Sequence, residues 1–454
     1  MALRKELGEL VRLALPASLA QLAIVGMSAT DVLIVGRAGT HELAGMNLGV
    51  NIWNLIMMFF MGIGFATQPL IAKCIGANDF AGAKQQFHQC AWMVVALGAI
   101  CTVSVLLGAL ALNALSIEAG IRSIAQSYLL IISLCALPIT LVPAIRGTLE
   151  GMGLTVPVML INFLAFLLNI PLDYIFVNGL YGFPAMGAVG SAWATVIVVC
   201  IMCLGNLWVL ARHPKTISIR FLADFSRWQW SSIKRIFALG LPIGFSILVE
   251  VSMFAGAGLM IAYFGAIEVG AHAIAITIAS ASFMFYMGLG QGVTIRAAQK
   301  LGANDHAGAH YSIKVGTTAN ACLALLVALV FIAAPEFWTS LFSKDQQVLA
   351  LAVSLLLFGA IFQLGDCIQV AAVCALRAYE DTVSPLKFQI ASFWLVGLPL
   401  GVVLAFSNYW PQMNGAKGMW LAMTASLYLV AVLLVVRLKK VMRQTARETY
   451  QVIT

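Results

Sequence analysis

The chain has 454 residues, of which 61% are hydrophobic and only 10% are charged, and its formal net charge is +8. A soluble globular domain carries about 25% charged residues, so these charges are too few to cover a surface that faces water. The composition excludes a soluble globular protein and predicts that lipid solvates most of the chain.

Apolar stretches bounded by charged residues or by turns rich in Gly and Pro predict twelve membrane-spanning helices. A span needs about 20 apolar residues, and several stretches are longer, which predicts tilted helices. The first stretch is too long for the apolar region of a signal peptide and is interpreted as the first span. The predicted spans are 11–36, 43–72, 88–112, 122–146, 156–178, 186–211, 235–263, 270–298, 312–334, 348–377, 386–407 and 416–438.

The distribution of Lys and Arg predicts the orientation of these spans. With the N-terminus inside, the loops and tails on that side hold all of the 26 Lys and Arg residues except Arg37, Arg122, Lys344 and Lys417. The positive-inside rule therefore predicts that both termini are cytoplasmic. We expect a monomeric multi-pass protein of a bacterial inner membrane. The same distribution accounts for the net charge, so nucleic-acid binding is not expected.

An internal repeat organises the chain. The Gly-Ala-Asn-Asp segment at 76–79 recurs at 302–305, an offset of 226, and Pro16 matches Pro242 at the same offset. Gly187-Ala188 matches Gly415-Ala416 at an offset of 228. Six spans separate the copies, so both halves enter the membrane in the same direction. The predicted fold is an all-α integral membrane protein of two parallel six-helix repeats: lobes 1–211 and 235–440, a basic cytoplasmic linker 212–234 and a cytoplasmic tail 441–454.

Acidic residues inside the predicted spans are the main functional signal, because each costs about 2.5–3.5 kcal/mol at the centre of a span. Asp31 and Asp173 lie at similar depth from the same side of the first lobe. Asn169 is four residues before Asp173 and therefore on the same helix face. These residues predict a site for a proton or another cation, with Na⁺ as a candidate ion.

The second lobe has acids of its own. Glu250 lies near the middle of span 235–263, one helical turn after Ser246, and Asp366 follows Gln363 by three residues. We expect these groups to form a second site, for a cation or the substrate. In the alternative interpretation each acid pairs with a basic residue and only holds the bundle together, but no Lys or Arg lies at mid-span.

Two prolines occupy equivalent positions in the first helix of each half. Proline removes a hydrogen bond inside a helix and tends to kink it. Pro16 and Pro242 could therefore mark the start of a helix, or they could act as hinges between conformations.

The chain resembles the multidrug and toxic compound extrusion (MATE) family, NorM-like branch, over nearly its whole length. The motifs that carry the resemblance are Thr30-Asp31 with Gly36, LLNIPLDYIF at 167–176, GAVGSAWAT at 187–195, LVEVSMF at 248–254, GAHAIAI at 270–276, LGDCIQVAA at 364–372, LRAYED at 376–381 and GAKGMWLA at 415–422. The family implies two six-helix lobes around a central cleft, which export organic cations and drugs by alternating access in exchange for H⁺ or Na⁺, without another cofactor.

The resemblance also implies roles for single residues. Asp31, Asn169 and Asp173 match the cation site of the family's N-terminal lobe, which Thr195 completes. Glu250 and Asp366 match the acidic pair of the C-terminal lobe. Phe362 stands where this branch commonly has a tyrosine near that pair, which weakens the case for Na⁺ there. The N-terminal lobe has its full set of oxygen ligands, which suits either ion, and H⁺ is the preferred coupling ion.

Three other functions compete with export. A lipid or oligosaccharide flippase of the same superfamily would need a cationic cleft, whereas the embedded charges here are acidic. An intramembrane enzyme would need a nucleophile with a base, or a metal cluster at helical spacing, and the six histidines form no such pattern. An ATP-driven pump would need a phosphate-binding GxxxxGK[ST] motif, which is absent.

Overall fold

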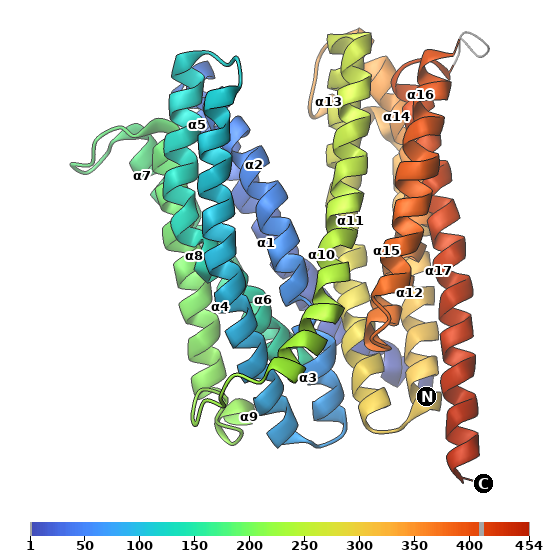
Figure 1. Ribbon diagram of the computed structural model, residues 1–454. Helices are drawn as coiled ribbons and strands as arrows, with labels where there is room; N and C mark the ends of the chain where they lie inside the picture. Colours follow the sequence, from blue (N-terminus) through green and yellow to red (C-terminus); the bar gives the residue numbers. More distant parts are fainter. Residues whose placement is uncertain (1, 408–412, 454) are drawn as a thin grey trace. The chain divides into compact units, whose positions relative to one another are not determined.

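The structure, a computed structural model, describes residues 2–407 and 413–453. Twelve helical segments within these ranges are long and apolar enough to cross a membrane, and each overlaps one predicted span (Figure 1). The ranges contain helices, turns and loops but no strand. The predicted fold class is therefore confirmed. The helices are longer than predicted: the first begins at Ala2, where hydropathy alone placed it at residue 11.

The chain divides into two compact units. The N-terminal unit is Leu19–Gly244, and the C-terminal unit is Met1–Ser18 together with Phe245–Thr454. The predicted lobes began instead at residues 1 and 235, so each unit holds the beginning of the other half's first helix. The unit boundaries, Ser18 and Gly244, are related by the same offset as Pro16 and Pro242 and therefore follow the repeat.

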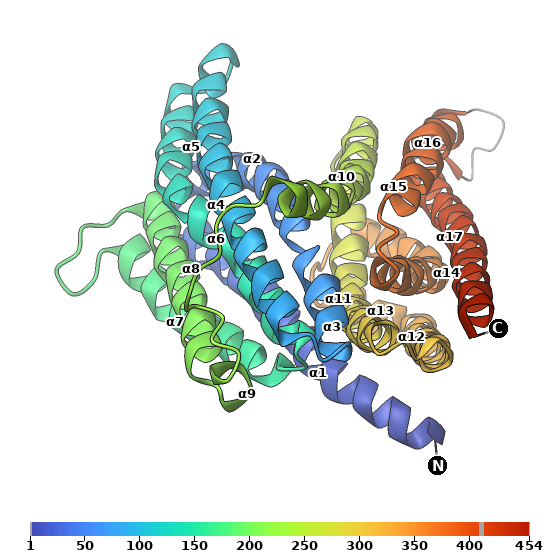
Figure 2. The same ribbon diagram turned by 60° about the horizontal axis from the view of Figure 1, so that its bottom comes forward.

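The N-terminal unit contains the second part of the first helix and the helices that follow it. Within this unit α7 and α8 lie side by side in both views (Figures 1 and 2). The helices are α1 (Ala2–Ala38, from Leu19 on), α2 (Thr40–Gly64), α3 (Thr67–Gly76), α4 (Phe80–Ala111), α5 (Ala119–Ile132), α6 (Ala136–Gly151), α7 (Thr155–Asn178), α8 (Gly187–Arg212) and the short α9 (Pro214–Ile217), followed by the first part of α10 (Trp230–Ile261).

The C-terminal unit repeats this order. After the remainder of α10 come α11 (Ala266–Gly302), α12 (His306–Ala333), α13 (Pro335–Ser340), α14 (Gln346–Ala378), α15 (Val383–Gln389), α16 (Leu398–Phe406) and α17 (Ala416–Ile453). A π-helical segment, Ile390–Gly397, joins α15 to α16, so these three pieces form one span.

The repeated Gly-Ala-Asn-Asp segments make the same turn in both units. Asn78 and Asn304 adopt the left-handed conformation, with φ of 56° and 58°, which asparagine tolerates better than most residues. The next residue, Asp79 or Asp305, then caps the following helix through its Oδ1, which accepts a hydrogen bond from an amide three residues on, at 2.8 Å. The sequence repeat therefore encodes a helix stop followed by a helix start.

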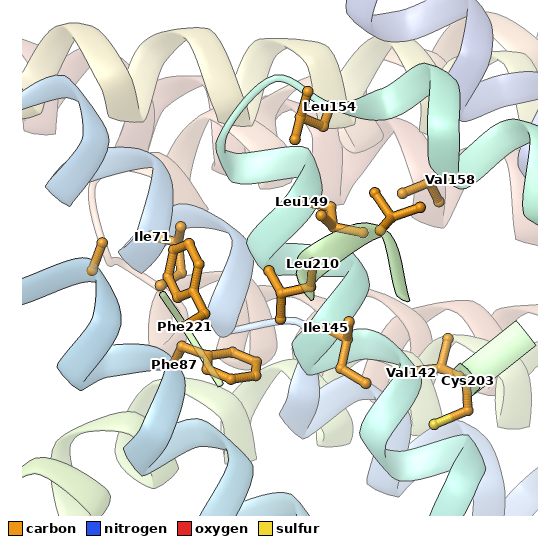
Figure 3. Close-up of a cluster of buried hydrophobic side chains, with 12 residues drawn as sticks. Ile71, Phe87, Val142, Ile145, Leu149, Leu154, Val158, Cys203, Leu210 and Phe221 are labelled. Atoms are coloured by element: carbon orange, nitrogen blue, oxygen red, sulfur yellow. The ribbon is translucent and has the colours of Figure 1, made fainter. Parts of the chain in front are cut away.

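Apolar side chains at one end of the N-terminal unit form a buried cluster (Figure 3). It joins Ile71 of α3, Phe87 of α4, Leu149 of α6 and Leu210 of α8. Phe221, from the predicted linker, belongs to the same cluster and is 1% exposed. This part of the linker is therefore packed against the helices and is not a loose connection.

Candidate ion and substrate sites

Three helices of the N-terminal unit bring its polar groups together. The Asp31 side chain on α1 lies within interaction distance of Asn169 and Asp173 on α7 and of Thr195 on α8. Asp173 also neighbours Ser191, one turn before Thr195. The structure thus assembles all the residues predicted for this lobe, although α1 is far from α7 and α8 in the sequence. We call these five residues the N-site.

The carboxylates of the N-site lack strong partners. Asp173 is 0% exposed and Asn169 is 1% exposed. Both carboxylate oxygens of Asp173 and Oδ1 of Asp31 are buried without a hydrogen bond of good geometry, although neighbouring polar groups are close. Neither acid forms an ion pair with a basic residue in the part of the chain that the structure describes. Asp173 is buried and Asp31 is partly buried. Two such acids without a basic partner have a high desolvation cost, which a bound proton or cation would reduce.

The donor set of the N-site consists of oxygen atoms. Carboxylate, amide and hydroxyl oxygens are ligands for hard cations, and a carboxylate is equally an acceptor for a proton. Over the described residues no cluster of three or more His, Cys, Asp and Glu side chains occurs. The donor set is therefore suited to a proton or to a hard cation.

A second polar group lies in the C-terminal unit. Glu250 on α10 and Asp366 on α14 are close enough for their charges to interact. Gln369 Nε2 donates to Glu250 Oε1 at 3.3 Å, and Gln389 Nε2 donates to Glu250 Oε2 at 3.4 Å. Asp366 is 4% exposed, and neither acid has an ion-pair partner among the described residues. We call Glu250, Asp366, Gln369 and Gln389 the C-site.

Two residues predicted for this site stand at its margin. Gln363 donates from Nε2 to the carbonyl oxygen of Ala279 on α11 at 3.3 Å and, within the described ranges, forms no hydrogen bond with either acid. Ser246 lies one turn before Glu250 on α10, and its buried hydroxyl has no hydrogen-bond partner in the ranges described. A spacing of three residues placed Gln363 near Asp366 in sequence, but its amide extends to a different helix.

Sequence reasoning missed Ser191 and Gln389. Ser191 carried a usable signal, because it precedes Thr195 by four residues and so shares its helix face. Gln389 carried none, since it is far from Glu250 in the sequence and belongs to no motif. It lies immediately before the π-helical segment Ile390–Gly397. Such segments occur often at functional sites.

The two sites are not copies of each other. At the offset of 226, Asp31 corresponds to Ala257 and Glu250 corresponds to Ile24. At the offset of 228, Asn169 corresponds to Gly397. The repeat therefore preserves the helices and their caps, while each unit carries a different set of polar groups.

Both predicted hinge prolines lie inside long helices. Pro16 is in α1 and Pro242 is in α10, each more than ten residues after its helix begins. The helix-start interpretation is therefore wrong. Each proline precedes a unit boundary, Ser18 or Gly244, by two residues. The helix thus carries a weakened hydrogen-bond ladder at the place where it passes from one unit to the other.

Comparison with known proteins agrees with the repeat and the fold. The MatE family model matches residues 16–175 and 242–403, one match in each half of the repeat. Multidrug resistance protein NorM of Vibrio cholerae is 32% identical over 447 residues, 97% of each chain. Multidrug resistance protein PmpM of Pseudomonas aeruginosa is 33% identical over 99% of this chain and 94% of its own. The crystal structure of the eukaryotic MATE transporter AtDTX14 has a TM-score of 0.87 and 16% identity, covering 99% of this chain and 100% of that one. The chain belongs to the MatE family of multidrug and toxic compound extrusion transporters.

Proposed function

We propose that this protein is a secondary active multidrug efflux antiporter, which exports small organic cations in exchange for H⁺ or Na⁺ by alternating access. The observation that carries the proposal is an acidic site in each unit, in which a buried aspartate, Asp173 or Asp366, forms no ion pair with a basic residue that the structure describes. An electronegative pocket inside a membrane attracts cations and rejects anions. The relatives named as multidrug resistance proteins support outward transport, with drugs as the substrates.

The N-site is the proposed coupling site. Asp31 and Asp173 approach each other closely, and an ion that binds there reduces their mutual repulsion and their desolvation cost. Asn169, Ser191 and Thr195 supply further oxygen atoms for Na⁺ or hydrogen-bonding groups around a protonated acid. The ion enters from outside, and its release inside restores the negative charge.

The C-site is the proposed second binding site, which takes the substrate or a further ion. Gln369 and Gln389 hold the Glu250 carboxylate by its two oxygens, which fixes the direction in which it faces. Phe362 is 3% exposed and packs against Phe254 and Trp420, so an aromatic ring, and no hydroxyl, lies one turn from Asp366. The lack of that hydroxyl weakens the case for Na⁺ at the C-site, whereas the oxygen atoms of the N-site suit either H⁺ or Na⁺.

Pro16 and Pro242 are the proposed hinges of alternating access. A helix that passes between two units must bend if the units move, and proline lowers the cost of bending at that point. We further propose that the protein is a monomer in a bacterial inner membrane. Both termini are proposed to lie in the cytoplasm, because the distribution of Lys and Arg favours this orientation.

The test is accumulation of a fluorescent organic cation in everted vesicles under a Na⁺ gradient or a pH gradient, imposed separately. We expect transport under one of the two gradients and at least about a tenfold loss in Asp31→Asn and in Asp366→Asn, since each variant removes a charge needed for binding or coupling. Glu118→Gln is the matched control, because Glu118 is 61% exposed and lies outside both sites.

The possible outcomes distinguish antiport, a protein whose N-site has no role, and the flippase alternative. Transport in wild type and in Glu118→Gln, with loss in both site variants, supports antiport and identifies the ion. Full activity in Asp31→Asn would contradict the role of the N-site. No transport of any cation under either gradient would contradict cation efflux and favour the flippase alternative.

A further inference from the structure

The segment that links α8 to α10 is fixed to the N-terminal unit by buried polar side chains of α4. His88 and Gln89 are 1% and 0% exposed. Nε2 of His88 donates to the carbonyl of Phe221 at 2.6 Å, and Nδ1 accepts from the amide of Ser226 at 3.0 Å. Gln89 binds the carbonyl of Arg227 and the amide of Gln229, each at 2.9 Å.

Aromatic packing adds to this attachment. Phe221 makes an edge contact with Phe87 inside the buried cluster of Figure 3, at 5.7 Å between ring centroids. Phe225 stacks on His88 at 4.1 Å. Trp92 Nε1 donates to the carbonyl of Ser226 at 3.0 Å. A flexible tether between the two units would need none of these interactions. They hold the segment in one conformation, so its exposed side chains form a defined surface.

That surface combines positive charge with exposed apolar side chains. Six basic side chains are exposed between 212 and 235, whereas Asp224 is the only acid there and is paired with Lys84 at 3.4 Å. The exposed large apolar side chains of the same stretch are Ile217, Leu222, Phe225, Trp228 and Trp230. Lys215, Arg220 and Arg227 form no ion pair with any residue that the structure describes. Tryptophan beside lysine and arginine is typical of the membrane interface.

The surface also contains a cavity and a strained backbone. A cavity of about 310 Å³ lies between the end of α8 and the segment, lined by Leu210, Ile217, Arg220 and Leu222 among others. Arg220 adopts the left-handed conformation, with φ of 55°. An arginine there is strained, and such strain persists where the surroundings impose it, often at binding sites. The cavity thus offers apolar walls and one guanidinium group.

We propose that residues 210–230 form a binding site for an anionic phospholipid. The phosphate group contacts Arg220, which lines the cavity, and the exposed Lys215 and Arg227 of the same segment add to the positive charge. One acyl chain lies along the apolar wall of the cavity, and Trp228 and Trp230 lie at the level of the headgroups. Trp228 and Trp230 already stack on each other, at 6.2 Å between centroids. Clusters of basic residues beside a membrane span attract anionic lipids, and the attraction is electrostatic. The linker between the two units is then also an anchor to the lipid surface.

Native mass spectrometry of the full-length protein in detergent tests this site, with phosphatidylglycerol and phosphatidylcholine as probes. We expect wild type to bind phosphatidylglycerol more tightly, and Lys215→Gln/Arg220→Gln/Arg227→Gln to bind it at least about tenfold more weakly. The control is Lys439→Gln/Lys440→Gln/Arg443→Gln, which removes the same charge from exposed residues of α17. This control should keep the preference of wild type.

Photo-crosslinking gives a readout that does not depend on the stability of any variant. A photoactivatable phosphatidylglycerol added to wild type should label peptides from 210–230, and excess phosphatidylglycerol should abolish the label while phosphatidylcholine does not. Equal binding of the two lipids by wild type, equal loss in both triple variants, or labelling confined to other peptides would overturn the proposal.

Discussion

Glu42 and Glu268, which are equivalent in the internal repeat, make the same hydrogen bond in the two units. Oε2 of Glu42 accepts from the backbone amide of Ala188 at 2.7 Å, and Oε2 of Glu268 accepts from the amide of Ala416 at 2.8 Å. Each carboxylate thus caps a long helix of its unit, α8 or α17, from a distant part of the chain. A negative charge at a helix N-terminus is also favoured by the helix dipole. The repeat has preserved a tertiary contact and not only a pattern of helices.

Removal of either carboxylate should destabilise its unit. Glu42→Ala and Glu268→Ala should each cost about 1–2 kcal/mol, the usual cost of a lost cap. The Gln variants keep an acceptor oxygen and should lose less. Thermal unfolding in detergent measures the effect, with Glu118→Ala as control, because Glu118 makes no capping hydrogen bond. Equal melting temperatures for Glu42→Ala and the control would show that this cap contributes nothing.

A methyl group at Gly187 should be harmful for two reasons. Gly187 has φ of 55°, and a Cβ there would lie 2.3 Å from Oε2 of Glu42. Gly187→Ala should therefore strain the backbone and displace the cap, at a cost of about 1–3 kcal/mol. Gly8→Ala is the control, because its Cβ would meet nothing within 4 Å inside α1 and should stabilise that helix by up to about 1 kcal/mol. Comparable melting temperatures for the two variants would contradict this account.

The cap at Asp305 should respond to acid. The Lys300 ammonium, at 2.9 Å, and the Gly308 amide lower the pKa of Asp305 below its ordinary value of 3.8. Because the folded pKa is lowered, the stabilisation is fully present above pH 3.8 and is lost as the pH falls through the folded pKa. Asp305→Ala should cost about 1 kcal/mol at neutral pH. Asp305→Asn keeps the cap and loses only a partly exposed ion pair, at most a few tenths of a kcal/mol.

Unfolding by denaturant at pH 7 and pH 3 checks both statements. The difference in unfolding free energy between wild type and Asp305→Ala should shrink at pH 3, because this pH lies below the ordinary pKa of 3.8 and folding must then remove a proton from the carboxyl group. A difference that is the same at both pH values would show that this carboxylate contributes nothing that depends on its charge.

Local spacing explains what could be predicted from the sequence. The twelve spans follow from hydropathy, and the turns at 76–79 and 302–305 follow from residues that stop and start helices. Asn169 and Asp173 were predicted to share a face because one helical turn separates them, and Asp31 was placed near them by depth. Each of these inferences needs only the geometry of a single helix and the thickness of a bilayer.

Contacts between distant helices explain what could not be predicted. Gln389 reaches Glu250, and His88 reaches Phe221, across long stretches of sequence, and no local pattern encodes either pair. The π-helical turn after Gln389 changes which side chains face inward, which an α-helical period cannot foresee. The unit boundaries at Ser18 and Gly244 depend on which half packs against each helical segment, a tertiary property that hydropathy does not contain.

The proposed hinges predict a loss of transport without a loss of stability. Proline inside a helix is about 3 kcal/mol less favourable than alanine, so Pro16→Ala and Pro242→Ala should fold at least as well as wild type. Their straighter, stiffer helices should slow vesicle transport several-fold. Pro143→Ala is the control, since Pro143 lies inside α6 and away from both unit boundaries. Wild-type rates in both hinge variants would refute the hinge role.

The last prediction concerns competition between the ion and the substrate for the carboxylates of the N-site. If H⁺ and an organic cation share the N-site, binding of tetraphenylphosphonium should favour the ionised acids and release protons, because a nearby positive charge stabilises a carboxylate. A pH indicator in weakly buffered detergent solution measures this release. The proton release should fall sharply in Asp173→Asn and persist in Glu250→Gln, whose change lies in the other unit.

If Na⁺ is the coupling ion, NaCl should displace tetraphenylphosphonium at fixed pH while N-methylglucamine chloride does not. Binding of tetraphenylphosphonium with neither proton release nor displacement by Na⁺ would mean that ion and drug do not meet at these carboxylates, and coupling would then have to pass through the conformation of the helices.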